Sequence, residues 1–281
     1  MPELPEVETI ASMLRTGGSH QPMICGCRVH QAQVFWARSL ANLTVPQFCN
    51  RITGQAIEDV RRRGKFVVLT LTHDTLLIHL RMSGDLRVES AVNQNGIDNE
   101  ILKHDRLLLD FDCGQRLVFN DTRKFGRVWL TDNPQEVLGS LGPEPLNNDL
   151  TGKVFHMMLG DHKRQLKPLL MDQSFLAGLG NIYTDEALYA ARLHPQRISN
   201  SLTYEEAIHL LKAIRNVLNE GIRRNGASID WVYRGGDFQN YFQVYGKTGQ
   251  PCLSCGTPIS RLVVGQRSTH ICPHCQPAGN S

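Results

Sequence analysis

The chain has 281 residues, of which 20% are charged and 41% are hydrophobic, and its formal net charge is +3 at pH 7. This length predicts two domains with sizeable cores, and the composition is that of an ordinary soluble protein. There is no apolar run of about 18 residues and no basic-then-apolar signal at the N-terminus, so we expect a cytosolic protein. The mildly basic charge permits an anionic partner without requiring one, so nucleic-acid binding must be argued from local clusters.

The first eight residues allow two interpretations. Removal of Met1 would leave Pro2 with a free secondary amine, a candidate nucleophile toward carbonyl carbon, and Glu3 beside it could move protons. A chain-start amine has a pKa of about 8, against about 10.4 for lysine, so more of it is unprotonated near neutral pH. Alternatively, Pro2 and Pro5 only open a helix, because proline suits the first turn and carboxylates suit its positive end. The apolar stripe of a half-buried helix follows: Val7, Ile10, Ala11 and Leu14.

From Cys25 to about Leu130 the pattern is typical of β-strands joined by short turns. Strands are expected at residues 66–71, 75–80, 106–111, 116–119 and 126–130. Because no helices alternate with them, they predict an antiparallel sandwich. The asparagine-rich segment 92–100 is an expected mobile loop. Four scattered cysteines are expected as buried thiols in a reducing compartment: Cys25, Cys27, Cys49 and Cys113.

Beyond a predicted linker at 142–149, the pattern is helical. Thr203-Tyr204-Glu205-Glu206 is a capping box, and the amphipathic helix that it opens is expected to end near Gly221. The fold class is therefore α+β. The predicted domains are a β-sandwich at 1–135, a linker at 136–150, a helical domain at 151–248 and a small cysteine unit at 249–281.

Two cysteine pairs near the end of the chain have the spacing of a metal site. Cys252-x2-Cys255 and Cys272-x2-Cys275 are separated by sixteen residues, as expected for a four-cysteine zinc site on a β-hairpin. Four thiolates fill the tetrahedron, so one structural, non-catalytic zinc ion per chain is predicted. The alternative is a pair of disulfides, which a reducing compartment disfavours.

Three further segments have both a structural and a functional interpretation. Arg261, Arg267 and His270 lie between the cysteine pairs and form either a solvated basic face or a phosphate-binding hairpin. The basic cluster 61–65 leads into a strand, and such a charge run is usually solvated. The Gly-x-Gly sequence at 178–180 is either a tight interhelical turn or a turn whose exposed N–H groups bind phosphate.

Five motifs, in order along nearly the whole chain, resemble the formamidopyrimidine-DNA glycosylases. They are Met-Pro-Glu-Leu-Pro-Glu-Val-Glu-Thr at 1–9, His-Leu-Arg-Met-Ser-Gly at 79–84, Asn-Asp-Thr-Arg-Lys-Phe-Gly at 120–126, the segment 170–183, and Gly-Gln-Arg-Ser-Thr at 265–269. The resemblance implies a β-sandwich with a long N-terminal helix, a helical domain with a helix–two-turns–helix motif, and a zinc hairpin. It also implies a monomer in the bacterial cytosol or nucleoid, without an organic cofactor, whose partner is double-stranded DNA with oxidised bases or abasic sites.

The activity implied by the resemblance is that of a bifunctional DNA glycosylase and AP lyase of base excision repair, which removes 8-oxoguanine and formamidopyrimidines. Pro2 would form a Schiff base with the sugar, Glu3 would act as acid and base, and β,δ-elimination would cut the strand. Lys65 would contact phosphate and donate a proton in β-elimination. Arg267 would hold phosphates beside the lesion and assist the later elimination. Glu6 would position the amine.

Seven further residues match DNA-contacting positions of the family. Met82, Arg123 and Phe125 match the residues that fill the gap when a nucleotide leaves the stack. The methionine and the ring replace lost stacking, and the arginine can hydrogen-bond the orphaned opposite base. The other implied DNA contacts are His79, His104, Lys163 and Asn181.

Two departures from the family pattern affect the expected recognition of the lesion. The usual Asp-Pro-Arg is Asp121-Thr122-Arg123 here, which loosens that loop and could alter reading of the opposite base. The segment 226–236 stands where the family has a mobile loop over the damaged base, and it is shorter than in some members.

Two rival functions stay open at this point. One is the sister glycosylase for oxidised pyrimidines, whose start reads Pro-Glu-Gly, and Leu4 argues against it. The other is a non-catalytic zinc-containing nucleic-acid-binding protein, which would need none of Pro2, Glu3 and Lys65.

Overall fold

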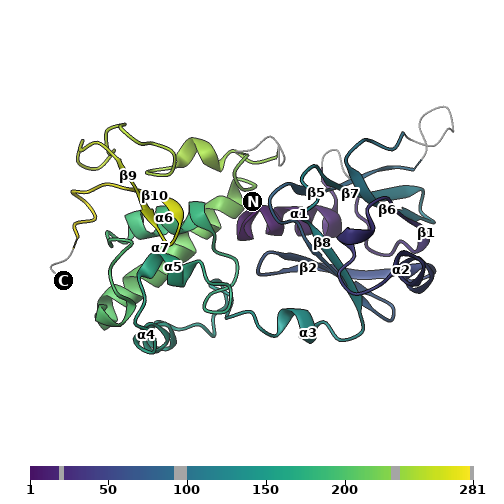
Figure 1. Ribbon diagram of the computed structural model, residues 1–281, viewed down its shortest axis with the longest axis horizontal. Coiled ribbons are helices and arrows are strands. Elements are labelled where there is room, and N and C mark those ends of the chain that lie inside the picture. Colours follow the sequence, from purple (N-terminus) through teal and green to yellow (C-terminus); the bar gives the residue numbers. More distant parts are fainter. Residues whose placement is uncertain (19–21, 92–99, 229–234, 279–281) are drawn as a thin grey trace. The chain divides into compact units, whose positions relative to one another are not determined.

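The computed structural model describes residues 1–18, 22–91, 100–228 and 235–278 (Figure 1). The expected mobile loop at 92–100 lies almost wholly outside the described residues, as does the middle of the segment 226–236. Within the described ranges, no helix is long and apolar enough to cross a lipid bilayer.

The chain folds into two compact units. The first unit contains Met1–Pro2 and Glu6–Gly139, and the second contains Glu3–Pro5, Ser140–Ser228 and the chain from Gly235 on. Helix α1 (Leu4–Thr16) contributes Leu4 to the hydrophobic core of the second unit and its later apolar residues to the core of the first.

The first unit is a sandwich of two antiparallel four-stranded sheets, with strand orders β1-β6-β7-β5 and β2-β3-β4-β8. Side chains from both sheets and from α1 form one core, which confirms the predicted sandwich. The elements are β1 (Val29–Val34), η1 (Ala37–Ser39), α2 (Val45–Ile52), β2 (Ile57–Arg63), β3 (Phe66–Leu71), β4 (Thr75–His79), β5 (Gly84–Ser90), β6 (Asp105–Phe111), β7 (Gln115–Asp121), β8 (Arg127–Thr131) and α3 (Gln135–Leu138).

Three of these strands were not among the predicted ones: β1, β2 and β5. All three are edge strands of their sheets. Edge strands carry polar and charged side chains, which prevent pairing with other chains, so they lack the continuous apolar runs of central strands. The basic cluster at 61–65 accordingly lies in β2 and in its turn to β3.

Two of the four scattered cysteines are not thiols. Cys27 and Cys113 form a disulfide across 86 residues of sequence, with their Cα atoms 5.8 Å apart. The cause is the pairing of β1 with β6, which sets Val29 opposite Phe111 and so brings the residues just outside both strands together. The prediction of buried thiols is wrong for this pair. Cys25 and Cys49 do remain thiols, although both are only partly buried.

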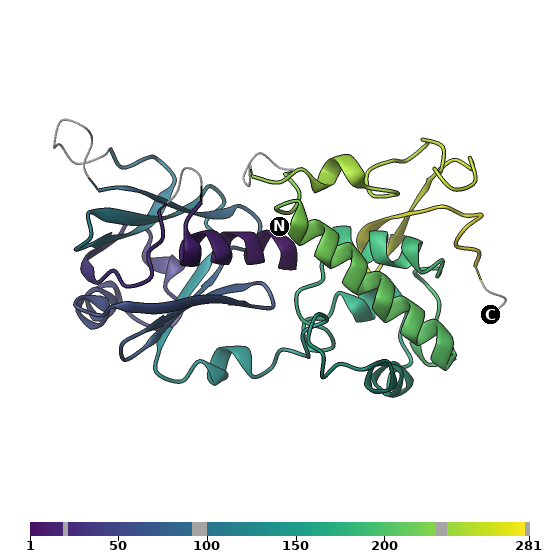
Figure 2. The same ribbon diagram turned by 180° about the vertical axis from the view of Figure 1, so that it is seen from behind.

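The second unit is helical and ends in a two-stranded hairpin (Figure 2). The long helix α7 packs against α4 and α6, and β10 lies against α6. The elements are α4 (Gly152–Gly160), α5 (Leu166–Leu170), α6 (Asn181–Ala190), η2 (Ser199–Ser201), α7 (Tyr204–Arg223), η3 (Phe238–Tyr241), β9 (Ser260–Val264) and β10 (Arg267–Ile271).

The capping box that begins α7 is present as predicted. The Thr203 hydroxyl accepts from the Glu206 N–H at 3.2 Å, and the Glu206 carboxylate accepts from the Thr203 N–H at 2.9 Å. The helix runs through Gly221 to Arg223 and does not stop at the glycine. A Cβ at Gly221 would lie 2.5 Å from the Tyr183 ring, so this glycine is required by close packing and not by helix termination.

Candidate active site

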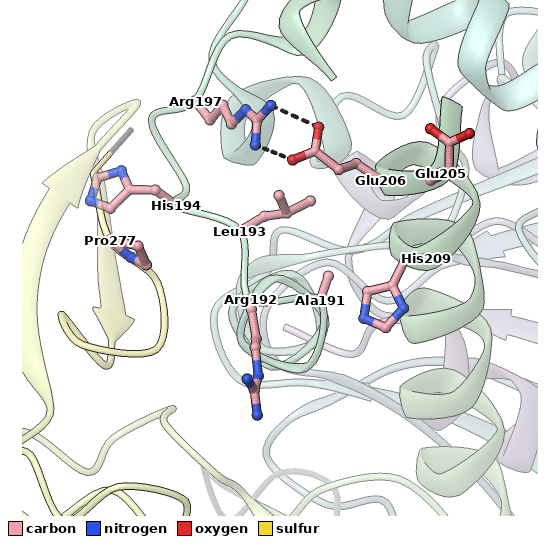
Figure 3. A pocket seen from close by; sticks show the side chains of 9 residues that line it. All are labelled: Ala191, Arg192, Leu193, His194, Arg197, Glu205, Glu206, His209 and Pro277. Carbon is pink, nitrogen blue, oxygen red and sulfur yellow. Dashed lines mark hydrogen bonds and ion pairs between the residues drawn. The ribbon is translucent and has the colours of Figure 1, made fainter. Parts of the chain in front are cut away.

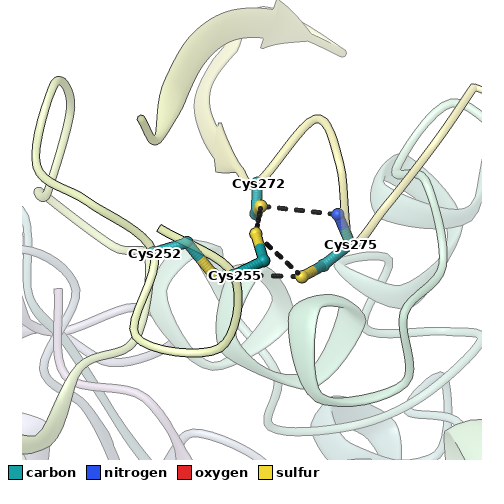
Figure 4. Close-up of side chains that lie close together, drawn as sticks. All are labelled: Cys252, Cys255, Cys272 and Cys275. Carbon is teal, nitrogen blue, oxygen red and sulfur yellow. Dashed lines mark hydrogen bonds between the residues drawn. The ribbon is translucent and has the colours of Figure 1, made fainter. Parts of the chain in front are cut away.

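Four thiols converge in the second unit, in the loop before β9 and the turn after β10 (Figure 4). The sulfur atoms of Cys252, Cys255, Cys272 and Cys275 all lie within 4.8 Å of one another. Separations of 3.4, 3.6 and 3.9 Å occur within the cluster. Sulfurs arranged tetrahedrally about zinc at about 2.3 Å are about 3.8 Å apart, so the cluster has the size that the metal requires. All four are free of disulfides, and they form the ligand set of a structural zinc ion, as predicted.

The surroundings of Cys252 favour its thiolate form. Burial alone would raise the pKa of Cys252, but hydrogen bonds from the Tyr189 hydroxyl and from the Ser254 and Cys255 N–H groups lower this pKa to about 6. The Tyr189 oxygen lies 3.2 Å from the Cys252 sulfur. Such outer partners orient metal ligands and tune their basicity.

Glu3 is buried at the amino end of α6, where unpaired backbone N–H groups and the helix dipole favour negative charge. Its carboxylate accepts from the N–H groups of Gly180 at 2.7 Å, Ile182 at 2.9 Å and Tyr183 at 3.4 Å. The carboxylate is therefore held in one orientation by the backbone of a distant segment.

The Gly-x-Gly turn before α6 binds the protein itself. The Gly180 N–H donates to Glu3, and the Gly178 N–H donates to the Gln173 side chain at 2.9 Å. Of the two interpretations of this sequence, these contacts favour the tight interhelical turn, because both N–H groups already donate within the protein. Next to them, Asn181 opens α6, and its side-chain oxygen is buried without a hydrogen-bond partner among the described residues.

Pro2 and Glu6 are both buried in the first unit, whereas Met1 is 43% exposed. Lys65, in the turn between β2 and β3, is only 4% exposed, unlike the solvated side chain that a charge run usually supplies. The structure thus separates Lys65 from the exposed Arg61 of the same cluster.

His79 closes β4 and is buried against Phe66, with the two rings in edge contact at 4.8 Å. Burial, together with the positive charges of Arg81 and Lys65, lowers the pKa of His79 to about 3. The ring is therefore neutral near pH 7, and its Nδ1 accepts from the Arg81 N–H at 3.0 Å. The proton of the neutral ring is then on Nε2, which is the one donor left for a ligand.

Met82, Arg123 and Phe125 lie on two loops of the first unit and are exposed. Met82 is 41% and Phe125 54% exposed, which is unusual for large apolar side chains. The Arg123 guanidinium lies 3.7 Å from the Met82 sulfur, so the side chains of the two loops meet.

Three further predicted site residues lie beside or at the start of helices and strands. His104 is half-buried just before β6, with its Nδ1 3.2 Å from the Arg106 guanidinium. Lys163 is exposed between α4 and α5. Arg267 is exposed at the first position of β10, directly after the hairpin turn.

Comparison with known proteins decides the family. The model of the formamidopyrimidine-DNA glycosylase N-terminal domain matches residues 1–128, that of the H2TH domain of the same enzymes matches 141–232, and that of the zinc finger found in FPG and IleRS matches 249–278. The formamidopyrimidine-DNA glycosylase of Protochlamydia amoebophila is 41% identical over 285 residues, covering 98% of this chain and 99% of the relative. This chain belongs to the formamidopyrimidine-DNA glycosylase family.

Other members of the glycosylase family agree in sequence and fold. The enzyme of Chloroflexus aurantiacus is 42% identical over 286 residues, covering 98% of each chain. MutM in complex with DNA containing carbocyclic 8-oxo-G matches with a TM-score of 0.88 and 35% identity, covering 99% of this chain and 100% of its own. The Lactococcus lactis glycosylase, non-covalently bound to DNA with an AP site, matches with a TM-score of 0.87 and 34% identity over 98% and 100% of the two chains.

Sequence reasoning missed a buried ionic cluster that holds the zinc hairpin of this glycosylase. Lys167 is 0% exposed and donates to Asp185 at 2.6 Å, to the Ser268 carbonyl at 2.9 Å and to the Thr269 hydroxyl at 2.9 Å. Asp185 also accepts from the His270 N–H at 2.9 Å. His270 is 7% exposed, so it is not part of a solvated basic face. No local pattern marks Lys167, because its partners lie far away in sequence.

A separate pocket of about 400 Å³ lies in the second unit (Figure 3). Arg197 and Glu206 form an ion pair in its wall, with Nη2 and Oε2 2.7 Å apart. None of the predicted site residues lines this pocket, so it has no part in the expected chemistry of the family. Its lining residues are Ala191, Arg192, Leu193, His194, Arg197, Glu205, Glu206, His209 and Pro277.

Proposed function

We propose that this family member is a bifunctional DNA glycosylase and AP lyase of base excision repair, which removes oxidised purines such as 8-oxoguanine and formamidopyrimidines. The observation that carries the proposal is the buried Glu3 carboxylate, which three backbone N–H groups fix directly after Pro2. A fixed carboxylate next to a chain-start amine suits proton transfer during attack on a sugar. Relatives named as formamidopyrimidine-DNA glycosylases support this substrate class.

The reaction begins once Met1 has been removed. The Pro2 nitrogen attacks C1′ of the extruded nucleotide, and the base departs with the electron pair of the glycosidic bond and takes up a proton. Glu3 gives a proton to the ring oxygen as the sugar opens, which leaves an iminium between Pro2 and C1′. Extruding the nucleotide costs a few kcal/mol and is easiest for a damaged pair.

Strand cleavage follows from the same covalent intermediate. The iminium acidifies the C2′–H bond, and loss of that proton expels the 3′ phosphate. Loss of the C4′ proton then expels the 5′ phosphate, and hydrolysis of the imine frees Pro2. We assign proton donation in the first elimination to Lys65. We assign to Arg267 the binding of phosphates beside the lesion, which assists the later elimination, and to Glu6 the positioning of the amine.

Binding of damaged DNA is assigned to side chains of both units. Met82, Arg123 and Phe125 occupy the gap that the extruded nucleotide leaves. Phosphate and backbone contacts are assigned to His79, His104, Lys163 and Asn181. Of these, His79 can donate only through Nε2, because its Nδ1 is bound to Arg81.

The domain division and the cellular state complete the proposal. We assign residues 1–135 to the catalytic sandwich, 136–150 to a linker, 151–248 to the helix–two-turns–helix domain and 249–281 to the zinc hairpin. The enzyme acts as a monomer in the bacterial cytosol.

Borohydride trapping on defined duplexes tests the function. Duplexes with 8-oxoguanine or with an oxidised pyrimidine are incubated with the protein and borohydride, and covalent adducts are counted. Trapping on 8-oxoguanine supports the proposal. Trapping on the pyrimidine alone would assign the sister activity, and binding without trapping would assign a non-catalytic protein.

The nucleophile is tested by blocking the chain start. An uncleavable N-terminal extension places the Pro2 nitrogen in an amide and should abolish trapping, while the same extension at the C-terminus should leave it intact. Mass spectrometry of the active protein should show Met1 removed. Full trapping by the N-terminally extended protein would exclude Pro2 as the nucleophile.

A further inference from the structure

A buried polar pair lies beneath the two loops that present Met82, Arg123 and Phe125. Asp121, the last residue of β7, is 1% exposed, and Ser83, directly after Met82, is 3% exposed. The Ser83 hydroxyl is hydrogen-bonded to Oδ1 of Asp121. The first loop is therefore joined to the second by side chains that solvent does not reach.

Asp121 also binds both ends of its own loop. Its Oδ1 accepts from the Arg123 N–H at 3.2 Å, and its Oδ2 accepts from the Gly126 N–H at 2.7 Å. The Ser83 oxygen accepts from the same Arg123 N–H at 3.0 Å. One carboxylate and one hydroxyl thus fix the entry and exit of the loop that carries Arg123 and Phe125.

The backbone of both loops is held in conformations that need support from their surroundings. Arg81 and Lys124 have φ angles of 55° and 61°, which non-glycine residues adopt at a cost. A Cβ on Gly126 would lie 2.3 Å from the Phe119 ring and 3.2 Å from Asp121 Oδ2, so this end of the loop is packed tightly against the carboxylate. Thr122 stands where the family usually has proline, so the loop lacks a pyrrolidine ring that would stiffen its backbone.

We propose that Asp121 and Ser83 are positioning residues that lock the two loops together, so that Met82, Arg123 and Phe125 enter DNA as one preformed unit. The role of these three side chains rests on the proposed function. A preformed unit avoids ordering two loops at the moment the nucleotide leaves the stack. The pair itself touches no substrate.

Hydrogen exchange in the free protein tests the lock without any DNA. Asp121→Asn places an amide donor against at least one of the N–H groups that the carboxylate accepts, whichever way the amide is turned. The Arg123 and Gly126 amide protons should then exchange about tenfold faster or more, as expected for loss of hydrogen bonds to a charged group. Ser83→Ala should accelerate Arg123 less, because Asp121 still accepts from it. Unchanged exchange at both amides in Asp121→Asn would overturn the inference.

Asp74→Asn is the matched control. Asp74 lies in the turn just before β4, at the end of that strand away from Met82. Its side chain is 4% exposed and accepts hydrogen bonds from Arg51 and Gln55. It is the same change at an equally buried carboxylate of the same unit. It should lower stability and leave exchange of the Arg123 and Gly126 amides unchanged.

The functional readout compares two reactions of the same variant. Excision of 8-oxoguanine from a duplex needs the gap to be filled, whereas cleavage of a single strand at an abasic site has no opposite base to support. Asp121→Asn should lose about tenfold or more in duplex excision relative to single-strand cleavage, and Asp74→Asn should not change this ratio. An equal loss of both reactions in Asp121→Asn would overturn the inference. A wild-type protein that excises nothing would refute the proposed function, while hydrogen exchange would still decide the lock.

Discussion

Glu3 and Gly180 lie so close together that no side chain fits between them. A Cβ built on Gly180 would fall 2.3 Å from Glu3 Cδ and 2.5 Å from its Oε1. The backbone of Gly180 is extended, with φ −132° and ψ −156°, a conformation that other residues also adopt. The glycine is therefore required by the space that the carboxylate occupies and not by the turn.

Gly180→Ala should displace the Glu3 carboxylate while the protein remains folded. Because Glu3 acts as acid and base in the proposed reaction, the rate of 8-oxoguanine excision should fall about 100-fold or more. Single-turnover kinetics and circular dichroism measure the two properties. Gly160→Ala is the control, since no atom lies within 4 Å of a Cβ there. A Gly180→Ala protein with the wild-type rate would show that the carboxylate need not be held at this place.

Lys167→Met should loosen the zinc hairpin next to Arg267. The change leaves the buried Asp185 charge with only its bonds to His270, so unfolding should become easier by about 3 kcal/mol. The KM for damaged DNA should rise as the start of β10 loses its anchor. The double variant Lys167→Met with Asp185→Leu removes both charges and should recover stability. Urea unfolding is the measurement, and Lys212→Met on the exposed side of α7 is the control that should change nothing.

Loss of the disulfide should destabilise the sandwich. Cys27→Ser with Cys113→Ser opens a link that spans 86 residues, and the free energy of unfolding should fall by about 2–4 kcal/mol. A reducing agent should lower the melting temperature of the wild-type protein and leave that of the double variant unchanged. Cys49→Ser, at a cysteine that is not bonded to another, serves as the control. Equal melting temperatures with and without reductant would indicate that the bridge adds no stability.

Asp105 should make the first unit sensitive to acid. Burial alone would raise the pKa of Asp105, but hydrogen bonds from Arg87 and Asn120 outweigh it, and the pKa is lowered. Since the folded pKa lies below the unfolded value of about 3.9, the stabilisation is present above that value and is lost as the pH falls through the folded pKa.

Asp105→Asn removes the contribution of the Asp105 charge to the pH dependence of stability. The variant should be less stable than wild type by about 2 kcal/mol near pH 7, and the difference should shrink as the pH falls through the acid range. Urea unfolding of both proteins across pH 2–7 measures it. A difference that grew in acid would contradict the lowered pKa.

The sequence by itself determined the features that depend on neighbouring residues. The spacing of Cys252, Cys255, Cys272 and Cys275 specified a zinc ligand set, because few other arrangements use four soft ligands so placed. The central strands could be predicted because both of their faces are buried and their apolar runs are therefore continuous. The capping box of α7 involves only residues three apart and was equally plain.

Only the tertiary structure decided which distant residues meet. The pairing of β1 with β6 brings Cys27 and Cys113 together in a disulfide. The Gly180 N–H before α6 donates to Glu3, where phosphate binding was one of two interpretations. No local sequence pattern distinguishes Lys167, and only the fold surrounds it with Asp185 and β10. A buried polar group needs a hydrogen-bond or ionic partner, and in these cases the partner is distant in sequence. A local sequence pattern carries no information on which distant segments pack together, so these contacts could not be predicted from the sequence.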